Sequence, residues 1–175
     1  MVLIRKERPD DAAEREALLD AAFGDHRWRK TSQRLRDGRT AAAELSFVAT
    51  DGKRIVGTAR LWDIICGSGA PALLLGPVAV AAEYRNRGIG AALVRHAIEK
   101  ARRRGHRAVI LVGDASYYGR FGFSAEKTGA LRMPGPFERD RLLGLELVPG
   151  ALGGARGLLR AAGRPLRPAV AASAA

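Results

Sequence analysis

The sequence contains a single cysteine, Cys66, which excludes a disulfide framework within the chain and fits a reducing cytoplasm. No apolar run approaches the roughly 18–20 residues that cross a membrane, and the N-terminal residues lack the apolar core of a signal peptide. Histidine is scarce, and no cluster of His, Cys and Asp has the spacing of metal ligands. We therefore expect a cytoplasmic protein with no membrane partner and no metal.

Acidic residues are also few: 18 Asp and Glu stand against 30 Lys and Arg, which gives a net charge of +12. Such an excess is typical of nucleic-acid binding, of attraction for a polyanionic cofactor, or of an arginine-rich composition from a GC-rich genome. Aromatic residues make up 6% of the chain and do not interleave with the basic ones as in a stacking surface. We attribute the positive charge mainly to an arginine-rich composition, with a contribution from attraction of a polyanionic cofactor, and we do not expect a nucleic-acid partner.

The chain of 175 residues is long enough for one full core, and its most informative stretch runs from Leu73 to Lys100. An apolar segment, 73–80, predicts a strand buried on both faces. A helix is predicted over 88–104, because its apolar residues recur on one face and Gly105 supplies a stop. Gly76-Pro77 interrupts the strand, and since proline cannot donate a ladder hydrogen bond, we expect a bulge there.

The turn between this strand and this helix is a candidate anion site. The first N–H groups of a helix have no intrahelical partner, and the helix dipole is positive there. Gly88 and Gly90 allow a ligand to approach the backbone, and Arg85 and Arg87 add positive charge. The turn therefore predicts a phosphate or pyrophosphate ligand, although its spacing differs from that of the usual nucleotide-binding loops.

The spacing Arg85-x-x-Gly88-x-Gly90 resembles the R/Q-x-x-G-x-G/A motif of the GNAT superfamily of acetyl-CoA-dependent N-acetyltransferases. VAV precedes it, AALV follows it, and YYGRFGF comes about thirty residues later. The resemblance covers Val2 to about Val148. It implies an α/β (α+β) fold with a mixed six- to seven-stranded sheet, splayed between the fourth and fifth strands, and about four helices.

The sequence places these elements as follows. Strands are expected over 2–6, 45–50, 53–65, 73–80, 108–112 and 142–148, with a further strand opening at 121–123; helices are expected over 10–23, 28–36, 88–104 and 115–120. We assign residues 1–148 to the acetyltransferase domain and 149–175 to a basic extension rich in Ala, Gly and Pro, whose last ten residues are expected to be disordered.

The resemblance also implies how the cofactor, acetyl-CoA, is bound. Its thioester arm would lie in the gap of the splayed sheet, paired with main-chain groups of the strand, which would also supply oxyanion donors, and its pyrophosphate would lie at the basic turn. Residues 24–40 would help to form the acceptor site. The expected cofactor-binding residues are Val78, Ala79, Val80, Arg85, Asn86, Arg87, Gly88, Ile89, Gly90 and Ala91.

Tyr118 is the candidate general acid, because it occupies the tyrosine position of the family's Tyr-x-x-x-Gly-Phe motif. A phenol with a pKa of about 10 can protonate a departing thiolate. Tyr117 is the neighbouring competitor, but on a helix it points about 100° away. The alternative role for Tyr118 is to hydrogen-bond the sulfur or to pack on the cofactor.

The general base is harder to assign. Many relatives carry a Glu on the strand equivalent to 73–80, and this strand has no acid. Asp63, in the apolar run LWDII, is the candidate base, since such surroundings would raise the pKa of its carboxyl and let it take a proton through water. The alternative is that Asp63 points to solvent from an edge, and Glu83 is expected to be solvated. Many members also have an Asn at the end of the parallel strand; Gly113-Asp114 stands here, so that cofactor contact cannot be carried over and Asp114 is expected to cap a helix.

These residues together predict an enzyme that moves an acetyl group from acetyl-CoA to a primary amine by direct transfer in a ternary complex. The acceptor would be a small-molecule or peptide amine, and the protein a monomer or homodimer. The rival interpretation, favoured by the missing strand carboxylate, is a non-catalytic acyl-CoA-binding or regulatory module. A basic nucleic-acid-binding protein is the third possibility.

Overall fold

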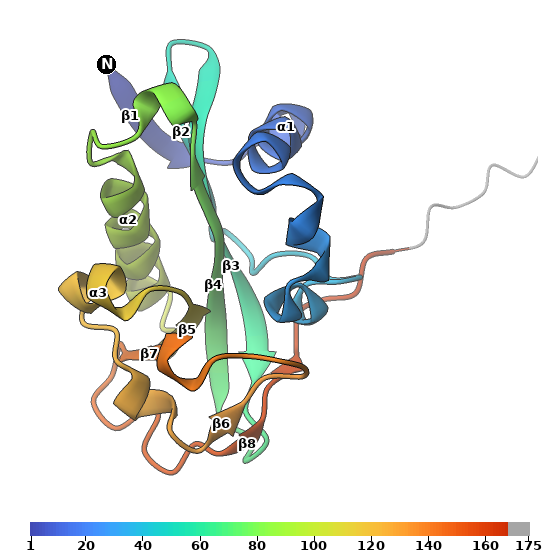
Figure 1. Cartoon of the computed structure of the whole chain (residues 1–175), viewed down its shortest axis with the longest axis vertical. Helices are drawn as coiled ribbons and strands as arrows, with labels where there is room; N and C mark the ends of the chain where they lie inside the picture. The colour runs from blue at the N-terminus through green and yellow to red at the C-terminus, as the bar shows by residue number, and fades with distance from the viewer. Residues whose placement is uncertain (168–175) are drawn as a thin grey trace, which may run out of the picture.

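A seven-stranded sheet forms the centre of the computed structural model, which describes residues 1–167 (Figure 1). The strand order is β1-β2-β3-β4-β5-β7, and β9 pairs with β3 beside this path. Within this sheet β4 and β5 are parallel and the other pairs antiparallel. The strands are β1 (Val2–Lys6), β2 (Ser46–Asp51), β3 (Arg54–Ile65), β4 (Pro71–Val80), β5 (Ala108–Val112), β7 (Leu142–Glu146) and β9 (Arg160–Ala161); a separate pair joins β6 (Leu131–Arg132) and β8 (Gly157–Leu158).

Helices cover both faces of the sheet. Figure 1 shows α1 on one side of the sheet and α2 on the other, with α3 beside α2. The α-helices are α1 (Ala12–Phe23), α2 (Ile89–Arg103) and α3 (Ala115–Tyr118). Short 3-10 helices join them: η1 (Pro9–Asp11), η2 (Gly24–Arg29), η3 (Thr31–Leu35), η4 (Ala82–Tyr84), η5 (Gly119–Phe121), η6 (Ala125–Thr128) and η7 (Arg139–Arg141).

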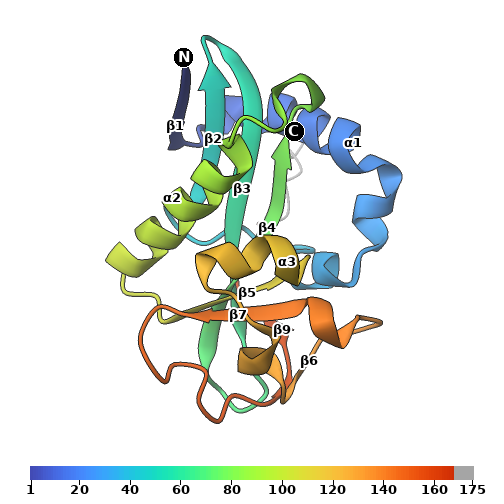
Figure 2. The ribbon, with the colours of Figure 1, turned by 60° about the vertical axis from the view of Figure 1, so that its left-hand side comes forward.

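The splay expected between the fourth and fifth strands is present. β4 and β5 pair at two positions only, Leu73 with Val109 and Leu74 with Ile110. Beyond Leu74, β4 continues to Val80 with no described strand on that side (Figure 2). The register of β3 against β4 shifts by one residue opposite Gly76-Pro77, which confirms the expected bulge.

Two segments differ from the sequence prediction. Residues 28–36 were expected to form one helix, but η2 and η3 are separate 3-10 helices with the extended residue Lys30 between them. This segment has no apolar stripe that could bury a regular helix. Residues 121–123 were expected to open a strand, but Gly122 adopts φ 95° and the chain continues into η6 after one isolated bridge between Ser124 and Gly144.

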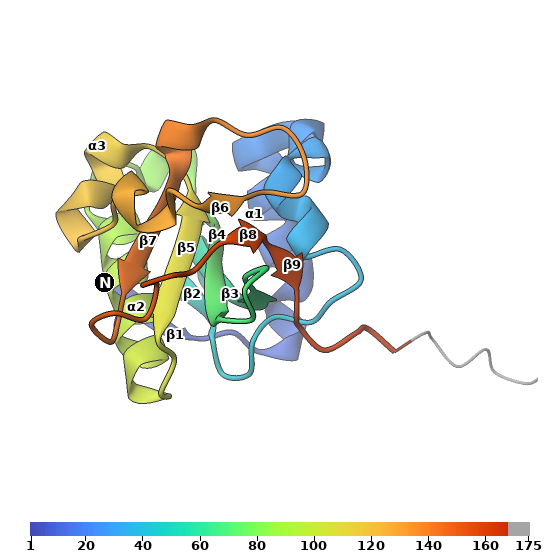
Figure 3. The same cartoon turned by 90° about the horizontal axis from the view of Figure 1, so that it is seen from below.

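The C-terminal segment packs on the domain. Residues 149–175 were assigned to an extension outside the domain, but Leu152, Ala155 and Leu159 are buried in one core cluster with residues of β3, β4, β5 and β7. Seen from below, the segment crosses this end of the sheet through β8 and β9 (Figure 3). The core therefore does not end at residue 148. The expected disorder of the last ten residues falls mainly on 168–175, which lie outside the described residues.

The contribution of this segment is testable with one pair of leucines. Leu159 is 0% exposed, so Leu159→Ala should lower the free energy of unfolding by about 2–5 kcal/mol through lost burial and a cavity. The same change at its neighbour Leu158, which is 39% exposed, should lower the free energy of unfolding much less. Denaturant unfolding of the two variants measures this difference; equal losses would contradict the packing described above.

Candidate functional site

The open side of β4 presents main-chain groups to the gap. Ala81 N–H donates to the carbonyl of Val56 at 2.8 Å, which makes these two residues a hydrogen-bonded pair. Hydrogen-bonded and non-bonded pairs alternate along antiparallel strands. In the register that joins β3 and β4 here, Ala79 therefore bonds Thr58, whereas Val78 and Val80 direct their N–H and C=O groups away from β3. The gap receives the polar groups of Val78 and Val80, and not those of Ala79.

The turn before α2 has the features of an anion site. The N–H groups of Ile89, Gly90 and Ala91 have no main-chain acceptor among the described residues, and the first bond of the helix runs from Ala92 N–H to Gly88 O at 3.0 Å. Gly88 adopts φ 78° and Asn86 φ 60°, both left-handed, so the turn closes tightly in front of the helix. No side chain caps the helix start. Three consecutive donors are therefore available to a ligand.

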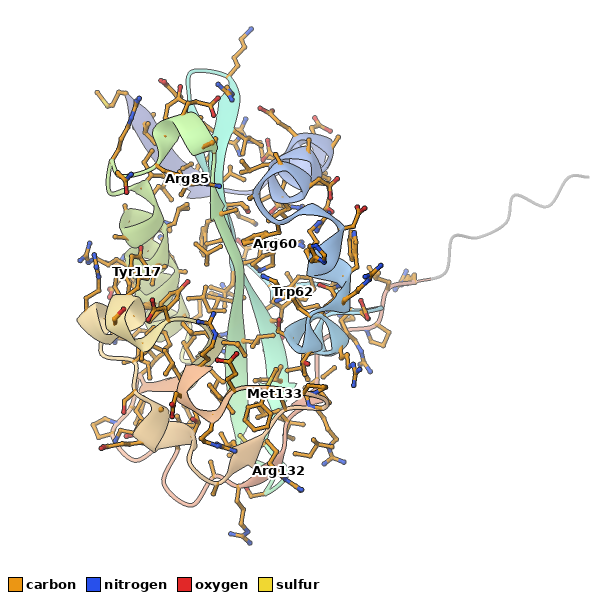
Figure 4. All side chains as sticks on the ribbon, in the orientation of Figure 1. Arg60, Trp62, Arg85, Tyr117, Arg132 and Met133 are labelled. Carbon is orange, nitrogen blue, oxygen red and sulfur yellow. The ribbon has the colours of Figure 1, made fainter. Side chains whose placement is uncertain are left out.

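The arginines of this turn have different positions. The guanidinium of Arg85 reaches back to the Val80 carbonyl, with a distance of 3.4 Å from Nε to the oxygen. Figure 4 shows Arg85 where β4 runs into the turn. The guanidinium of Arg87 lies over the ring of Tyr84, 4.9 Å from its centroid. Ile89 is buried in the core and so has only its main chain to offer.

A cavity of about 640 Å³ opens beside the bend of β4. Its walls come from the segment after α1, from the bend of β4, from the end of β5 with α3, and from the loop before β7. Tyr118 and Val78 are the predicted site residues that line it. The full lining comprises Phe23, Arg27, Lys30, Thr31, Ser32, Gln33, Arg36, Leu75, Gly76, Pro77, Val78, Leu111, Val112, Gly113, Asp114, Tyr118, Pro136, Phe137, Glu138 and Arg141.

The side chains of the two tyrosines of α3 lie in different places. Tyr118 lines the cavity, and its burial raises the pKa of the phenol above 10. The hydroxyl of Tyr117 instead lies beside α2: a Cβ built on Gly90 would stand 3.4 Å from it. Figure 4 shows Tyr117 between α3 and α2. The two rings pack edge to face, with their centroids 4.9 Å apart, and this contact stabilises the orientation of both side chains.

The candidate base Asp63 is not brought to this cavity. It lies on β3 opposite Leu73, where β4 is still paired with β5, and it does not line the cavity. Glu83 lies in the turn after β4 and forms an ion pair with Arg54 on the surface. Neither carboxylate is near Tyr118 by these contacts.

Two carboxylates that the sequence did not assign to catalysis line the cavity. Asp114 caps α3 as expected: it accepts from the N–H and the hydroxyl of Ser116 at 2.9 and 2.8 Å, and these bonds lower the pKa of its carboxyl. Glu138 is exposed at the rim, and its side chain has no bond to another described residue. No local motif marks Glu138, because only the fold brings it to the cavity that Tyr118 also lines.

Basic side chains line the opposite wall. Arg27 and Arg36 are each 7% exposed, and Lys30 lies between them in sequence. The ammonium of Lys30 stands 4.3 Å from the centroid of the Phe23 ring. Partial desolvation, together with the charges of Arg36 and Arg141, lowers its pKa. Figure 4 shows Arg60 and Trp62 between β4 and this wall.

The part of the chain that the structure describes offers neither a metal site nor a membrane-spanning helix. Residues 1–167 contain no group of three or more His, Cys, Asp or Glu side chains able to hold a metal ion. Over the same range, no helix has the length and apolar character of a membrane span.

A splayed parallel pair, free N–H groups at the following helix and a cavity beside the bend define an acyl-CoA-dependent acyltransferase fold. The model of the Acetyltransferase (GNAT) family matches residues 11–123, and the chain belongs to this family. It is 30% identical over 160 residues to the uncharacterized N-acetyltransferase YhbS of Escherichia coli K12, covering 90% of this chain and 95% of that protein.

Solved structures agree. The E. coli YhbS structure in complex with CoA superposes with a TM-score of 0.78 and 31% identity, covering 91% of this chain and 89% of that one. A GNAT family acetyltransferase from Brucella melitensis in complex with acetyl-CoA superposes with a TM-score of 0.62 and 30% identity, covering 83% of this chain and 96% of that one. The expected GNAT fold and membership, the enzyme class and acetyl-CoA as cosubstrate are thus confirmed.

The turn can be tested through Gly90. A Cβ there would meet only ordinary contacts, at 3.4 Å from the Tyr117 hydroxyl and 3.6 Å from Val80 Cγ2, so the fold should accept Gly90→Val. The added methyl groups would stand over the free N–H groups, and we expect CoA binding to weaken at least about tenfold, as for the loss of one or two charge-assisted hydrogen bonds. Isothermal titration with CoA measures this.

Ala92→Val is the matched control, because Ala92 is exposed on the same helix and the change adds the same β-branched side chain. It should bind CoA as the wild type does. Equal CoA affinity in all three proteins would place the phosphates elsewhere.

Proposed function

We propose that this N-acetyltransferase moves the acetyl group of acetyl-CoA onto a primary amine by direct transfer, with both substrates bound at once. The observation that carries the proposal is the cavity itself. One wall is the splayed end of β4 and β5, where the thioester would lie, and the opposite wall is a separate segment, 24–36, with room for an acceptor. A cavity with two different walls suits a ternary complex.

The transfer needs a neutral amine, stabilisation of the developing oxyanion and a proton for the leaving thiolate. The amine lone pair attacks the carbonyl carbon, the C–S bond breaks, and the excess proton leaves the nitrogen. We assign the oxyanion to the free N–H of Val78, and we assign the proton donated to the thiolate to the phenol of Tyr118. The pyrophosphate would take the N–H groups of Ile89, Gly90 and Ala91, beside the guanidiniums of Arg85 and Arg87.

Glu138 replaces Asp63 as the candidate base. Glu138 lines the cavity and is exposed to water, so it can accept the amine proton directly or through a water molecule. Asp114, the other carboxylate of the cavity, already accepts two hydrogen bonds from Ser116. A monomeric or homodimeric state and a cytoplasmic location remain predictions from the sequence.

Removing the Tyr118 hydroxyl should act on the chemical step. Tyr118→Phe keeps the ring and its packing, and general acid catalysis is typically worth about 10²–10⁴ in rate. We expect kcat to fall by that order while the affinity for acetyl-CoA changes little. Tyr117→Phe is the control: it should retain kcat, because its hydroxyl lies at α2 and not in the cavity. Full kcat in Tyr118→Phe would overturn the assignment.

The pH dependence follows from the same group. The active form of the phenol is protonated, and burial raises its pKa, so activity should fall only as the pH rises past the raised pKa of this phenol. The alkaline limb of the kcat profile should therefore lie above the ordinary pKa of a phenol in the wild type and vanish in Tyr118→Phe. The acid limb reports the acceptor amine. An alkaline limb near neutral pH would mean that another group supplies the proton.

The activity is tested by adding acetyl-CoA with and without a panel of primary amines and following thiol release and acetylated product. Amine-dependent release is expected. CoA binding without transfer to any amine, across the panel, would favour a non-catalytic acyl-CoA-binding module instead.

A further inference from the structure

Two buried arginines in the wall of the cavity differ in one respect. The guanidinium of Arg27 is neutralised twice, by Glu16 at 2.5 Å and by Asp20 at 2.9 Å. Arg36, equally buried at 7% exposure, has no carboxylate within ion-pair distance among the described residues. Its Nε donates to the side-chain oxygen of Gln33 at 3.1 Å. Its two terminal nitrogens donate to no acceptor in residues 1–167.

A charged group in a largely buried side chain is normally paired with an opposite charge, because burial weakens its hydration. Burial lowers the pKa of Arg36 only to about 10, so the side chain keeps its charge at neutral pH. The neighbouring positive charges of Arg60 and Arg27 lower the pKa of Arg36 further, whereas the negative charge of Asp37 raises it. Asp37 does not bond Arg36, because its carboxylate accepts a hydrogen bond from the side-chain amide of Gln33 at 2.7 Å. The guanidinium of Arg36 therefore has no ion-pair partner among the described residues, and its terminal nitrogens are not fully buried but reach the open space of the cavity.

The free end of Arg36 points into the cavity. Nη1 stands 3.4 Å from the position that a Cβ on Gly76 would take, beside the bend of β4. Gly76 and Arg36 both line the cavity, as does Lys30. The turn that would hold the CoA phosphates, residues 85–91, does not line it. The charge is thus presented to the second substrate.

We propose that the acceptor is an amine that also carries an anionic oxygen group, a carboxylate or a phosphate, and that Arg36 binds this group with help from Lys30. The proposal rests on the proposed function, because it identifies the chemical class of the acceptor of that same cavity. The two free nitrogens of a guanidinium match two oxygens of a carboxylate or phosphate side by side. An anion held at Arg36 directs the amine of the same molecule toward the wall that carries Tyr118.

The first experiment measures anion binding without turnover. The protein is first saturated with CoA, so that the sites for the CoA phosphates are filled. It is then titrated with inorganic phosphate and with acetate while the arginine side-chain Nε–H signals are followed by NMR. A saturable shift of one signal that is absent from the spectrum of Arg36→Gln is expected. No saturable arginine shift with either anion in the CoA-loaded wild type would overturn the proposal.

The second experiment compares matched amines. α-Amino acids are assayed against their carboxamides, and O-phosphoethanolamine against ethanolamine, which also separates carboxylate from phosphate as the source of the anion. The anionic member of at least one pair should have the higher kcat/KM, and Arg36→Gln should raise its KM about 10- to 100-fold. The KM for acetyl-CoA should stay the same. Equal kcat/KM within every pair would overturn the proposal.

The variants separate charge from folding. Arg36→Lys keeps the charge and should recover part of the lost affinity. Lys30→Gln, at an exposed position, should raise the same KM by a smaller factor even if Arg36→Gln fails to fold. Arg29→Gln is its control, because Arg29 is the exposed neighbour that does not line the cavity, and it should behave as the wild type.

The two proposals fail in different ways. If the wild type binds no CoA in a direct titration, or acetylates no amine, the proposed function fails. If CoA binds and neutral amines are acetylated as well as their anionic counterparts, the function stands and the role of Arg36 is wrong.

Discussion

The parting of β4 from β5 after Leu74 is the constraint on which the rest of this structure depends. A strand inside a sheet normally satisfies its main chain on both sides, and an unpaired edge is a template for another extended chain. Here the unpaired edge lies inside the molecule, where Val78 and Val80 offer alternate N–H and C=O groups to a narrow gap. The helix that follows brings its free N–H groups to one end of this gap, and the cavity lies at the other.

The excess of arginine divides into two populations once the contacts are known. Arg5 and Asp11 join β1 to η1, Arg15 and Glu7 join α1 to the chain just after β1, and Arg27 and Glu16 join η2 to α1, all through buried or half-buried ion pairs. With 18 acids for 30 basic groups, many arginines must lack a partner, and most of these can stay in water. Arg36 lacks a partner without being exposed. Composition explains the number of arginines, but it does not explain this position.

The parts that the sequence predicted are local ones. β5 has the expected bounds, α2 was placed to within a residue, and the bulge at Gly76-Pro77 follows from proline alone. The anion site and the role of Tyr118 were predicted from short motifs with fixed spacing, and they stay predictions. The errors concern contacts distant in sequence. Leu159 was placed in the extension outside the domain, because nothing near it in sequence shows that it belongs to the same buried cluster as Leu35 and Trp62. Asp63 looked isolated and reactive, but strand pairing puts it opposite Leu73, below the splay. Arg36 and Glu138 carry no motif, since only the fold brings them to one cavity.

The departure from the family pattern at the end of β5 is linked to the placement of Tyr118, the proposed general acid. At the end of β5, where the family resemblance implies an asparagine in many members, this chain has Gly113-Asp114, and Gly113 is buried. A Cβ at that position would stand 2.6 Å from one ring carbon of Tyr118 and 2.9 Å from another, which is closer than side chains can approach. The ring of Tyr118 therefore occupies the space that a side chain at 113 would need. α3 has only four residues, capped by Asp114, so the tyrosine starts close to the strand and folds back against it. The absence of a side chain at 113 and the position of Tyr118 are therefore linked, because the ring lies against the end of β5 where that side chain would stand.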